Sequence, residues 1–269
     1  MKSLLLNFRR FPEIKPLFIC LLLLQAILVF PQALLATASD SEHLQKAFQK
    51  AFTNPNELKG SGMFEALGYT PEQIRQMLEV TPKPATLTVE MKPGNGPGEF
   101  EDILVRATQV KYYGLLIDNA LFSFPGSVLD SEALASDTLK FNRLREVIIE
   151  TRVSEADLLK VFPFTTRSRQ LSDLKLKFSP KEVNLRGKMR QSVLVIGFSL
   201  NGLPEIVKEK RIDFRCSRLV LNGIPLPRAA IKAMFNHVNP VFDSEKTWLN
   251  LRLEKISMET GFVFCRAHL

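Results

Sequence analysis

Residues that could carry out chemistry are few in this chain and do not form a recognisable site. The histidines are His43, His237 and His268, and no pair of them has the spacing of metal ligands. Cys216 and Cys265 alone do not supply the ligand set of a structural zinc site. The sequence therefore predicts no bound metal and no cofactor.

The motifs of nucleophilic and phosphate chemistry are also incomplete. Residues 197–201 (Gly-Phe-Ser-Leu-Asn) lack the second glycine of a nucleophile elbow and lie inside a strand pattern. The Gly-x-Gly-x-Gly pattern at 94–98 contains two prolines, so it indicates a hairpin turn. Asp118, Asn119 and Asp130 lie in no catalytic frame and are expected to cap helices or form turns. We predict no catalytic residues and expect the chain not to be an enzyme.

The segment most suited to binding is a short amphipathic helix predicted after Pro227 and ended by Pro240. Its apolar face could line a lipid groove, with cations on its other side meeting a headgroup phosphate. The alternative is a helix that only plugs a sheet, with its basic side in solvent. The candidate groove residues are Ile231, Met234, Phe235 and Val238, and the candidate headgroup residues are Arg228 and Lys232.

Two further aromatic residues, Phe162 and Phe164, flank a proline in a predicted loop. Aromatic side chains in loops at the mouth of a groove can enter a bilayer interface, and they can equally fasten a loop to the core. We therefore add both residues to the candidate lipid-binding set.

The N-terminus has the layout of a secretory signal peptide. Four basic residues precede an apolar run at 17–30, and Ala36-Thr37-Ala38 then offers a cleavage site. We predict cleavage after Ala38 and an exported protein of the periplasm or cell envelope, with a retained N-terminal anchor as the alternative. Removing residues 1–38 takes away four basic residues and Glu13, so the net charge falls from +8 to +5. This charge fits an anionic membrane surface, while the scattered cations argue against nucleic acid.

Residues 39–84 are predicted to form an N-terminal helical segment added to the main fold. Apolar residues recur at helical spacing from Leu44 to Phe52, and Asn54-Pro55-Asn56 ends that helix. Thr70 and Pro71 then form a helix N-terminus. The prolines at 82 and 84 separate this segment from the rest.

From residue 85 to 269 the apolar period changes to two, which predicts antiparallel strands with one wet face. Turns are predicted at 93–98, 179–182 and 201–202, and a capping box from Ser154 to Asp157 opens a short helix. The apolar faces of so many strands need a cover. We therefore predict an α+β fold with a strongly curved antiparallel sheet wrapped around short helices. The sequence does not decide whether Cys216 and Cys265 form a disulfide, because it does not show whether they lie within bonding distance.

Three stretches resemble the LmeA-like phospholipid-binding family (DUF2993). The first is the strand and helix start from Val147 to Leu158, and the second is the strand meander from Leu171 to Leu200. The third runs from Leu219 through Gly223-Ile224-Pro225-Leu226-Pro227, the helix, Asn239-Pro240 and the last strands. The resemblance covers about residues 95–266 and has no counterpart for residues 40–80.

This resemblance implies an exported cell-envelope protein with a tube-like fold that binds phospholipid acyl chains and has no catalytic residues. Such a protein would serve lipid transport or envelope maintenance. The alternative is a structural or scaffolding envelope protein whose partner is another protein. A self-filled sheet without room for a ligand would favour that alternative.

Overall fold

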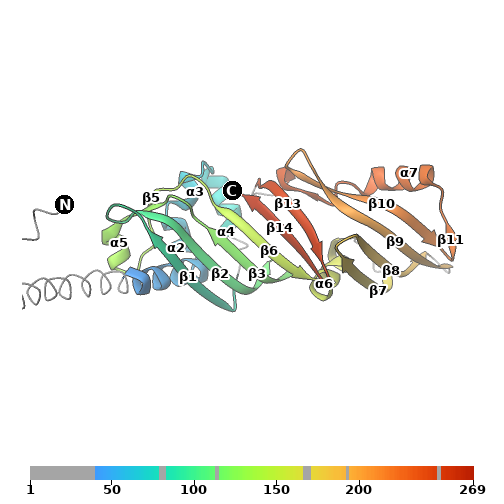
Figure 1. Cartoon of the computed structure of the whole chain (residues 1–269), viewed down its shortest axis with the longest axis horizontal. Helices are drawn as coiled ribbons and strands as arrows, with labels where there is room; N and C mark the ends of the chain where they lie inside the picture. Colours follow the sequence, from blue (N-terminus) through green and yellow to red (C-terminus); the bar gives the residue numbers. More distant parts are fainter. Residues whose placement is uncertain (1–39, 79–82, 113–114, 166–170, 192–193, 247–249) are drawn as a thin grey trace, which may run out of the picture.

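The computed structural model describes residues 40–78, 83–112, 115–165, 171–191, 194–246 and 250–269, so the predicted signal peptide lies outside the described residues. The described chain is an elongated α+β fold with antiparallel sheets, as the sequence predicts (Figure 1). The prediction of one sheet needs correction. The strands form two six-stranded sheets, neither closed into a barrel, and one small two-stranded sheet.

The first sheet has the strand order β1-β2-β3-β6-β14-β13, and every neighbouring pair is antiparallel. The strands are β1 (Thr86–Pro93), β2 (Phe100–Tyr112), β3 (Leu115–Ser123), β6 (Ile148–Ser154), β13 (Arg252–Glu259) and β14 (Phe262–His268). The predicted hairpin with its turn near 93–98 is confirmed. Asp118 and Asn119 lie within β3 and form no turn, whereas Asp130 caps helix α5 (Ser131–Ala135).

The second sheet has the order β11-β10-β9-β8-β7, and β12 pairs with β10 beside it. Its strands are β7 (Leu171–Ser179), β8 (Glu182–Gln191), β9 (Leu194–Val207), β10 (Arg211–Leu221), β11 (Ile224–Pro225) and β12 (Phe242–Asp243). Strands β4 (Val128–Leu129) and β5 (Phe141–Arg143) form the small sheet. We call the end of the second sheet that points away from the first sheet, where β11 lies, the distal end (Figure 1).

The N-terminal helices are residues 40–53, α2 (Pro55–Gly60), α3 (Met63–Ala66) and α4 (Pro71–Leu78). Asn54 caps α2 with its side chain, so the predicted helix stop also starts the next helix. Thr70 and Gln73 form a reciprocal capping box at α4, with N···O distances of 2.9 and 3.3 Å.

These helices are not a peripheral addition, because they share one hydrophobic core with the first sheet. The Phe48 ring lies 5.3 Å from the Phe124 ring, and the Phe52 ring lies 5.3 Å from the Phe122 ring. The Gln45 side chain also bonds the backbone of β1 at Leu87 and Val89, which protects the free edge of the sheet. The helical segment was predicted to be an addition to the main fold. It is instead part of the core of the first sheet.

Helix α6 (Glu155–Thr165) fills the junction between the two sheets. Its predicted capping box is confirmed, since Ser154 Oγ donates to Asp157 Oδ2 at 2.6 Å and accepts from the Asp157 N–H at 3.2 Å. Leu158 and Leu159 pack in a cluster with β7 and β8 residues of the second sheet and with Met258 of the first. The sheets thus meet in one apolar cluster.

The turn predicted at Asn201-Gly202 is wrong, because both residues lie within β9. Asn201 instead bonds across the sheet, donating to Glu182 Oε2 at 2.7 Å and accepting from Asn184 Nδ2 at 2.8 Å. Gly202 is required by a close approach of the neighbouring strand. A Cβ there would lie 2.4 Å from the Arg215 carbonyl oxygen and 2.6 Å from the Phe214 ring.

We expect Gly202→Ala to lower the free energy of unfolding by about 1–3 kcal/mol, because the added methyl group meets backbone that cannot move alone. Gly197→Ala in the same strand is the control, since its Cβ would meet only Asn222 Oδ1 at 3.6 Å. Urea denaturation of both variants measures the difference. Equal stability of the two variants would contradict the close packing at Gly202.

Candidate functional site

One face of the second sheet, which we call the inner face, consists of apolar residues and glycine. Cross-strand pairs such as Leu176↔Leu185 and Leu185↔Leu200 place these residues side by side. Gly187 leaves space that Leu174 and Phe198 occupy. The inner face comprises Leu171, Leu174, Leu176, Phe178, Val183, Leu185, Gly187, Met189, Leu194, Ile196, Phe198, Leu200, Phe214, Cys216, Leu219 and Leu221.

The opposite, outer face of this sheet is largely polar and carries cross-strand hydrogen bonds. Arg186 Nε donates to Asn184 Oδ1 at 2.9 Å, and the amides of Asn184 and Asn201 continue the chain of bonds. The two faces therefore differ in chemistry, and only the inner face needs a cover.

Burial of the inner face decreases toward the distal end along β7, β8 and β9, whereas Leu219 of β10 stays buried beside α7. Near the first sheet, the cluster with α6 buries Leu176, Phe178, Val183 and Leu185. Farther out, Ile196 in β9 and Met189 in β8 are partly exposed, and Leu194 at the start of β9 is 65% exposed. The apolar face thus continues beyond the part that the described chain covers.

Helix α7 (Arg228–Val238) lies against β10 and borders this face. Ile231 is buried, and the rings of Phe235 and Phe214 lie 5.8 Å apart. Past the helix, the Asn239 side chain accepts from the Phe214 N–H at 2.9 Å and donates to the Phe214 carbonyl at 3.2 Å. This residue substitutes for a neighbouring strand and fixes the end of α7 to β10.

The structure divides the predicted lipid-binding residues of α7 into two groups. Ile231 and Phe235 hold the helix on the sheet, whereas Met234 and Val238 are 44% and 54% exposed. Arg228 and Lys232 are exposed and form no ion pair with the described residues. Phe162 and Phe164 do not lie in a loop, because α6 extends to Thr165; their side chains lie outside the described residues.

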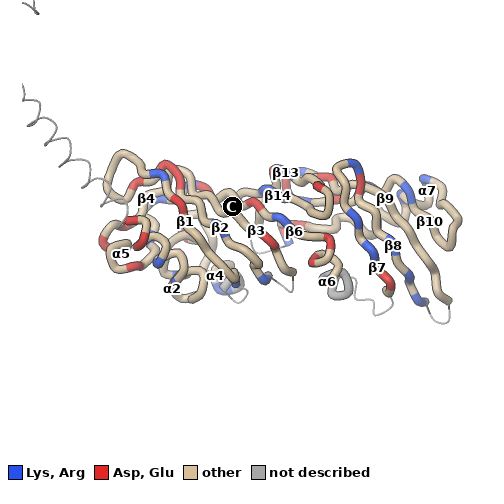
Figure 2. Tube along the Cα trace, turned by 60° about the horizontal axis from the view of Figure 1, so that its bottom comes forward, with Lys and Arg blue, Asp and Glu red and all other residues tan. Residues whose placement is uncertain are grey.

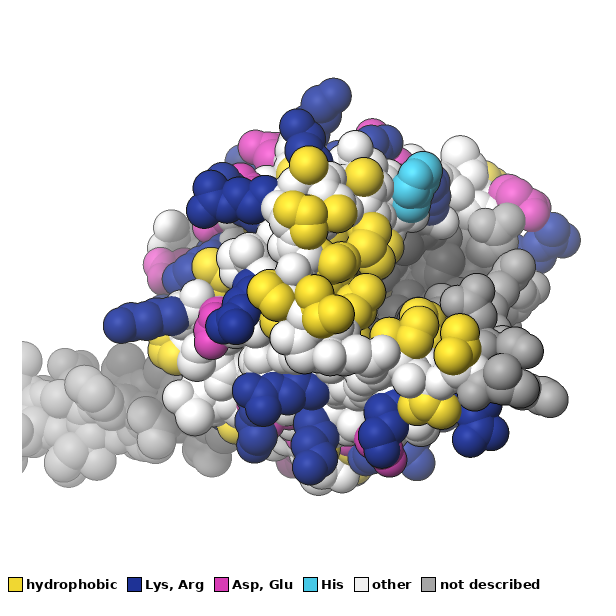
Figure 3. All heavy atoms as spheres, turned by 90° about the vertical axis from the view of Figure 1, so that its right-hand side faces the viewer, with side chains coloured by type: hydrophobic (Ala, Val, Ile, Leu, Met, Phe, Trp, Pro, Cys, Tyr) yellow, Lys and Arg dark blue, Asp and Glu magenta, His cyan; other side chains and the backbone are white. Residues whose placement is uncertain are grey.

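Seen from the distal end, hydrophobic side chains form a continuous band across the described surface (Figure 3). Lys and Arg side chains lie above, to the left of and below this band, and few acidic side chains lie beside it (Figure 3). The band and its basic rim form the candidate functional site.

Cys216 and Cys265, the cysteines among the described residues, are both free. Cys265 lies in β14 opposite Thr151 and Ile256, and burial raises the pKa of its thiol to about 11. Cys216 lies on the inner face opposite Gly202, and burial also raises its pKa. Raised pKa values keep both thiols protonated at neutral pH, so neither is an activated nucleophile.

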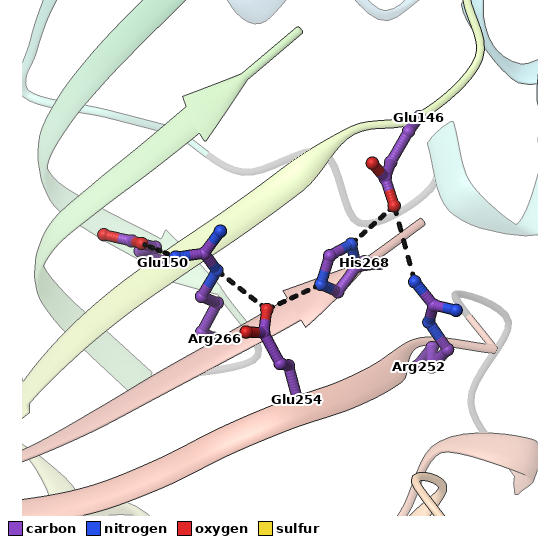
Figure 4. Close-up of polar contacts among 6 residues, drawn as sticks. All are labelled: Glu146, Glu150, Arg252, Glu254, Arg266 and His268. Atoms are coloured by element: carbon purple, nitrogen blue, oxygen red, sulfur yellow. Dashed lines mark hydrogen bonds and ion pairs between the residues drawn. The ribbon is translucent and has the colours of Figure 1, made fainter. Parts of the chain in front are cut away.

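A network of charged residues on the first sheet is the other polar cluster of note (Figure 4). His268 bonds Glu146 through Nδ1 at 2.6 Å and Glu254 through Nε2 at 2.7 Å. The bond to His268 and nearby cations lower the pKa of Glu254. Arg266 Nε lies 2.8 Å from Glu254 Oε2, so the two side chains form an ion pair. The Arg266 Nε–H is not directed at that oxygen, and the contact is therefore not a hydrogen bond.

This network joins β6, β13, β14 and Glu146, and Arg252 also pairs with Glu146 at 3.5 Å. Its carboxylates contact cations, and it contains no hydroxyl or thiol nucleophile. Such an arrangement ties strands together and offers no acyl-transfer site. Sequence spacing did not connect His268 with a carboxylate, because only strand pairing brings Glu146, more than a hundred residues away, beside it.

No group of three or more His, Cys, Asp or Glu side chains among the described residues is placed to hold a metal ion. Among the described helices, none has the length and apolar character needed to cross a bilayer.

Comparisons with protein-family models, with curated proteins and with solved structures find no match for this chain.

The inner-face residues of β7, β8 and β9 are the part of the site that sequence reasoning did not assign. Their alternation was visible and predicted the strands, but it did not show which residues stay uncovered. Leu194, Ile196 and Met189 belong to the candidate site because α6 and α7 do not extend over them.

Proposed function

We propose that this protein binds acyl chains of phospholipid along the inner face of the second sheet and performs no chemical step. The observation that supports the proposal is the fall in burial along that face, from packed Leu185 to exposed Leu194. A soluble monomer rarely leaves a contiguous apolar surface of this kind without a function.

The dimensions of the face suit an acyl chain. From Leu194 to Leu200 strand β9 advances about 20 Å, at roughly 3.3 Å per residue. The hydrocarbon core of one leaflet is about half of a roughly 30 Å bilayer core, so an extended chain fits along this length. Each methylene that leaves water contributes about 0.8 kcal/mol, which makes the chain rather than the headgroup the main source of affinity.

The wider proposal follows the family resemblance. We propose that the chain is related to the LmeA-like family, is exported to the cell envelope, and takes part in lipid transport or envelope maintenance there. The strand meander, the Gly-x-x-x-Pro start of α7 and its Asn-Pro end support this relationship.

Native mass spectrometry with organic extraction tests the binding. The sample is a chain starting at Ser39, which retains every described residue, purified from a bacterial host without detergent. We expect phospholipid at close to one molecule per chain, because the inner face from Leu194 to Leu200 is about as long as one acyl chain. Lipid-free, monodisperse protein that also takes no lipid from vesicles would contradict the proposal and favour a scaffolding protein.

A further inference from the structure

We infer that the distal end of the second sheet is a docking surface for an anionic phospholipid bilayer. This inference rests on the proposed function in one respect: the docking surface is where a lipid would enter the inner face. Two features, exposed apolar side chains and an excess of cations over acids, lie together at this end.

The exposed large hydrophobic side chains of the described chain all lie between residues 194 and 241. The two most exposed are Leu194 at 65%, which opens β9, and Ile224 at 67%, which opens β11. Both strand starts lie at the distal end, where β11 marks the tip of the molecule (Figure 1). Apolar side chains at such tips can enter the boundary between headgroups and acyl chains.

The charges of the molecule are strongly divided along its length (Figure 2). Residues 40–165 and 250–269, which form the first sheet and its helices, contain 16 Lys and Arg and 20 Asp and Glu, whereas residues 171–246 contain 14 and 7. A net charge of −4 at one end and +7 at the other would orient the molecule over an anionic surface, with the second sheet toward it.

Within the second sheet, cations occur at both ends, but most of the acids lie toward the first sheet, which leaves an excess of cations at the distal end. Residues 183–204 and 214–242 contain no Asp or Glu, while Glu182, Glu205 and Asp213 lie at the strand ends nearer the first sheet. The acid-free stretches contain Arg186, Lys188, Arg190, Arg215, Arg218, Arg228 and Lys232. Asp173 is the acid on β7, and it pairs with Lys188 at 2.7 Å.

An anionic bilayer is the partner that matches both features. An acidic protein partner would match the cations, but it would not account for the exposed apolar side chains of Leu194 and Ile224 at the end of the inner face. A bilayer offers phosphate groups to the cations and hydrocarbon to Leu194 and Ile224. Docking in this way places the exposed end of the inner face at the membrane, from which a lipid chain can enter.

Vesicle flotation tests the docking surface with the chain starting at Ser39. We expect it to float with phosphatidylcholine vesicles that contain phosphatidylglycerol, and to float less with phosphatidylcholine alone. The double variant Leu194→Asp/Ile224→Asp should lose most binding. The double variant Arg190→Gln/Arg228→Gln should lose about fivefold in binding constant for each cation removed.

Controls make the same kinds of change, an apolar residue to Asp and a cation to Gln, away from the distal end. Leu203→Asp changes an exposed residue of the same strand that faces outward, opposite Arg215. Lys59→Gln/Lys92→Gln removes two exposed cations at the other end of the molecule. Both controls should float like the original chain.

The lipid content of each preparation, measured by extraction, separates this inference from the proposed function. Original chain that floats but carries no lipid supports docking and contradicts lipid retention. Equal flotation with both kinds of vesicle, or unchanged flotation of both distal variants, overturns the docking surface. Self-association in solution that Ile224→Asp abolishes overturns it too, because the tip would then be covered by a second copy.

Discussion

Ile196→Asp is expected to reduce co-purifying phospholipid from about one molecule per chain to less than about one tenth, because a carboxylate beside an acyl chain loses its hydration. Ile196 pairs with Met189 in the middle of the uncovered part of the inner face. It is partly exposed, so the substituted side chain is not forced into a closed core. Native mass spectrometry measures the lipid, and circular dichroism shows whether the sheets persist.

The control for this variant is Leu203→Asp, which places the same carboxylate in the same strand on the outer face. It should retain lipid fully. Met234→Asp is a second test that does not depend on the stability of β9, since Met234 is exposed on the flank of α7. Full lipid retention by both Ile196→Asp and Met234→Asp would exclude the inner face as the binding site.

Ile231→Asp is not suited to this test, although Ile231 was a candidate lipid-binding residue. Its side chain is only 6% exposed and holds α7 on the sheet. A buried carboxylate there would detach the helix, so a loss of lipid would follow from misfolding as readily as from a changed groove.

Phe48→Ala is expected to lower the free energy of unfolding by about 3–5 kcal/mol, which is a large share of the stability of a typical domain. Phe48 is completely buried, and its ring contacts Phe52 and Phe124 at centroid distances of 6.4 and 5.3 Å. Its removal leaves a cavity between the helix 40–53 and the first sheet. Urea denaturation followed by circular dichroism measures the loss.

Gln49→Ala is the matched control, because it shortens the next side chain of the same helix on the exposed side. It should change stability by less than about 0.5 kcal/mol. A loss of under 1 kcal/mol for Phe48→Ala would mean that the helices are indeed an addition to a fold that stands without them.

Several elements could be predicted from the sequence because short-range physics decides them. The capping boxes at Thr70 and Ser154 and the extent of α7 depend on residues within a few positions of each other. The turn at Asn201-Gly202 was predicted wrongly for the same reason. Asparagine and glycine favour turns locally, but here Gly202 pairs with Val183 on one side and Cys216 on the other, which keeps it in an extended strand.

Only part of the candidate site could be predicted from the sequence. Helical spacing grouped Ile231, Met234, Phe235 and Val238 on one face, yet it could not tell the residues that face β10 from those that face solvent. That distinction depends on the side from which β10 approaches, and β10 is fixed by its pairing with β9.

The sequence by itself determined the α+β class, the alternation that makes the second sheet apolar on one face, and the separation of basic from acidic residues along the chain. Periodicity and composition are properties of the chain, so folding does not change them. Only the tertiary structure decided that the strands divide into two sheets and that the N-terminal helices are core. It also decided which part of the inner face stays open, because coverage depends on contacts between residues far apart in the sequence.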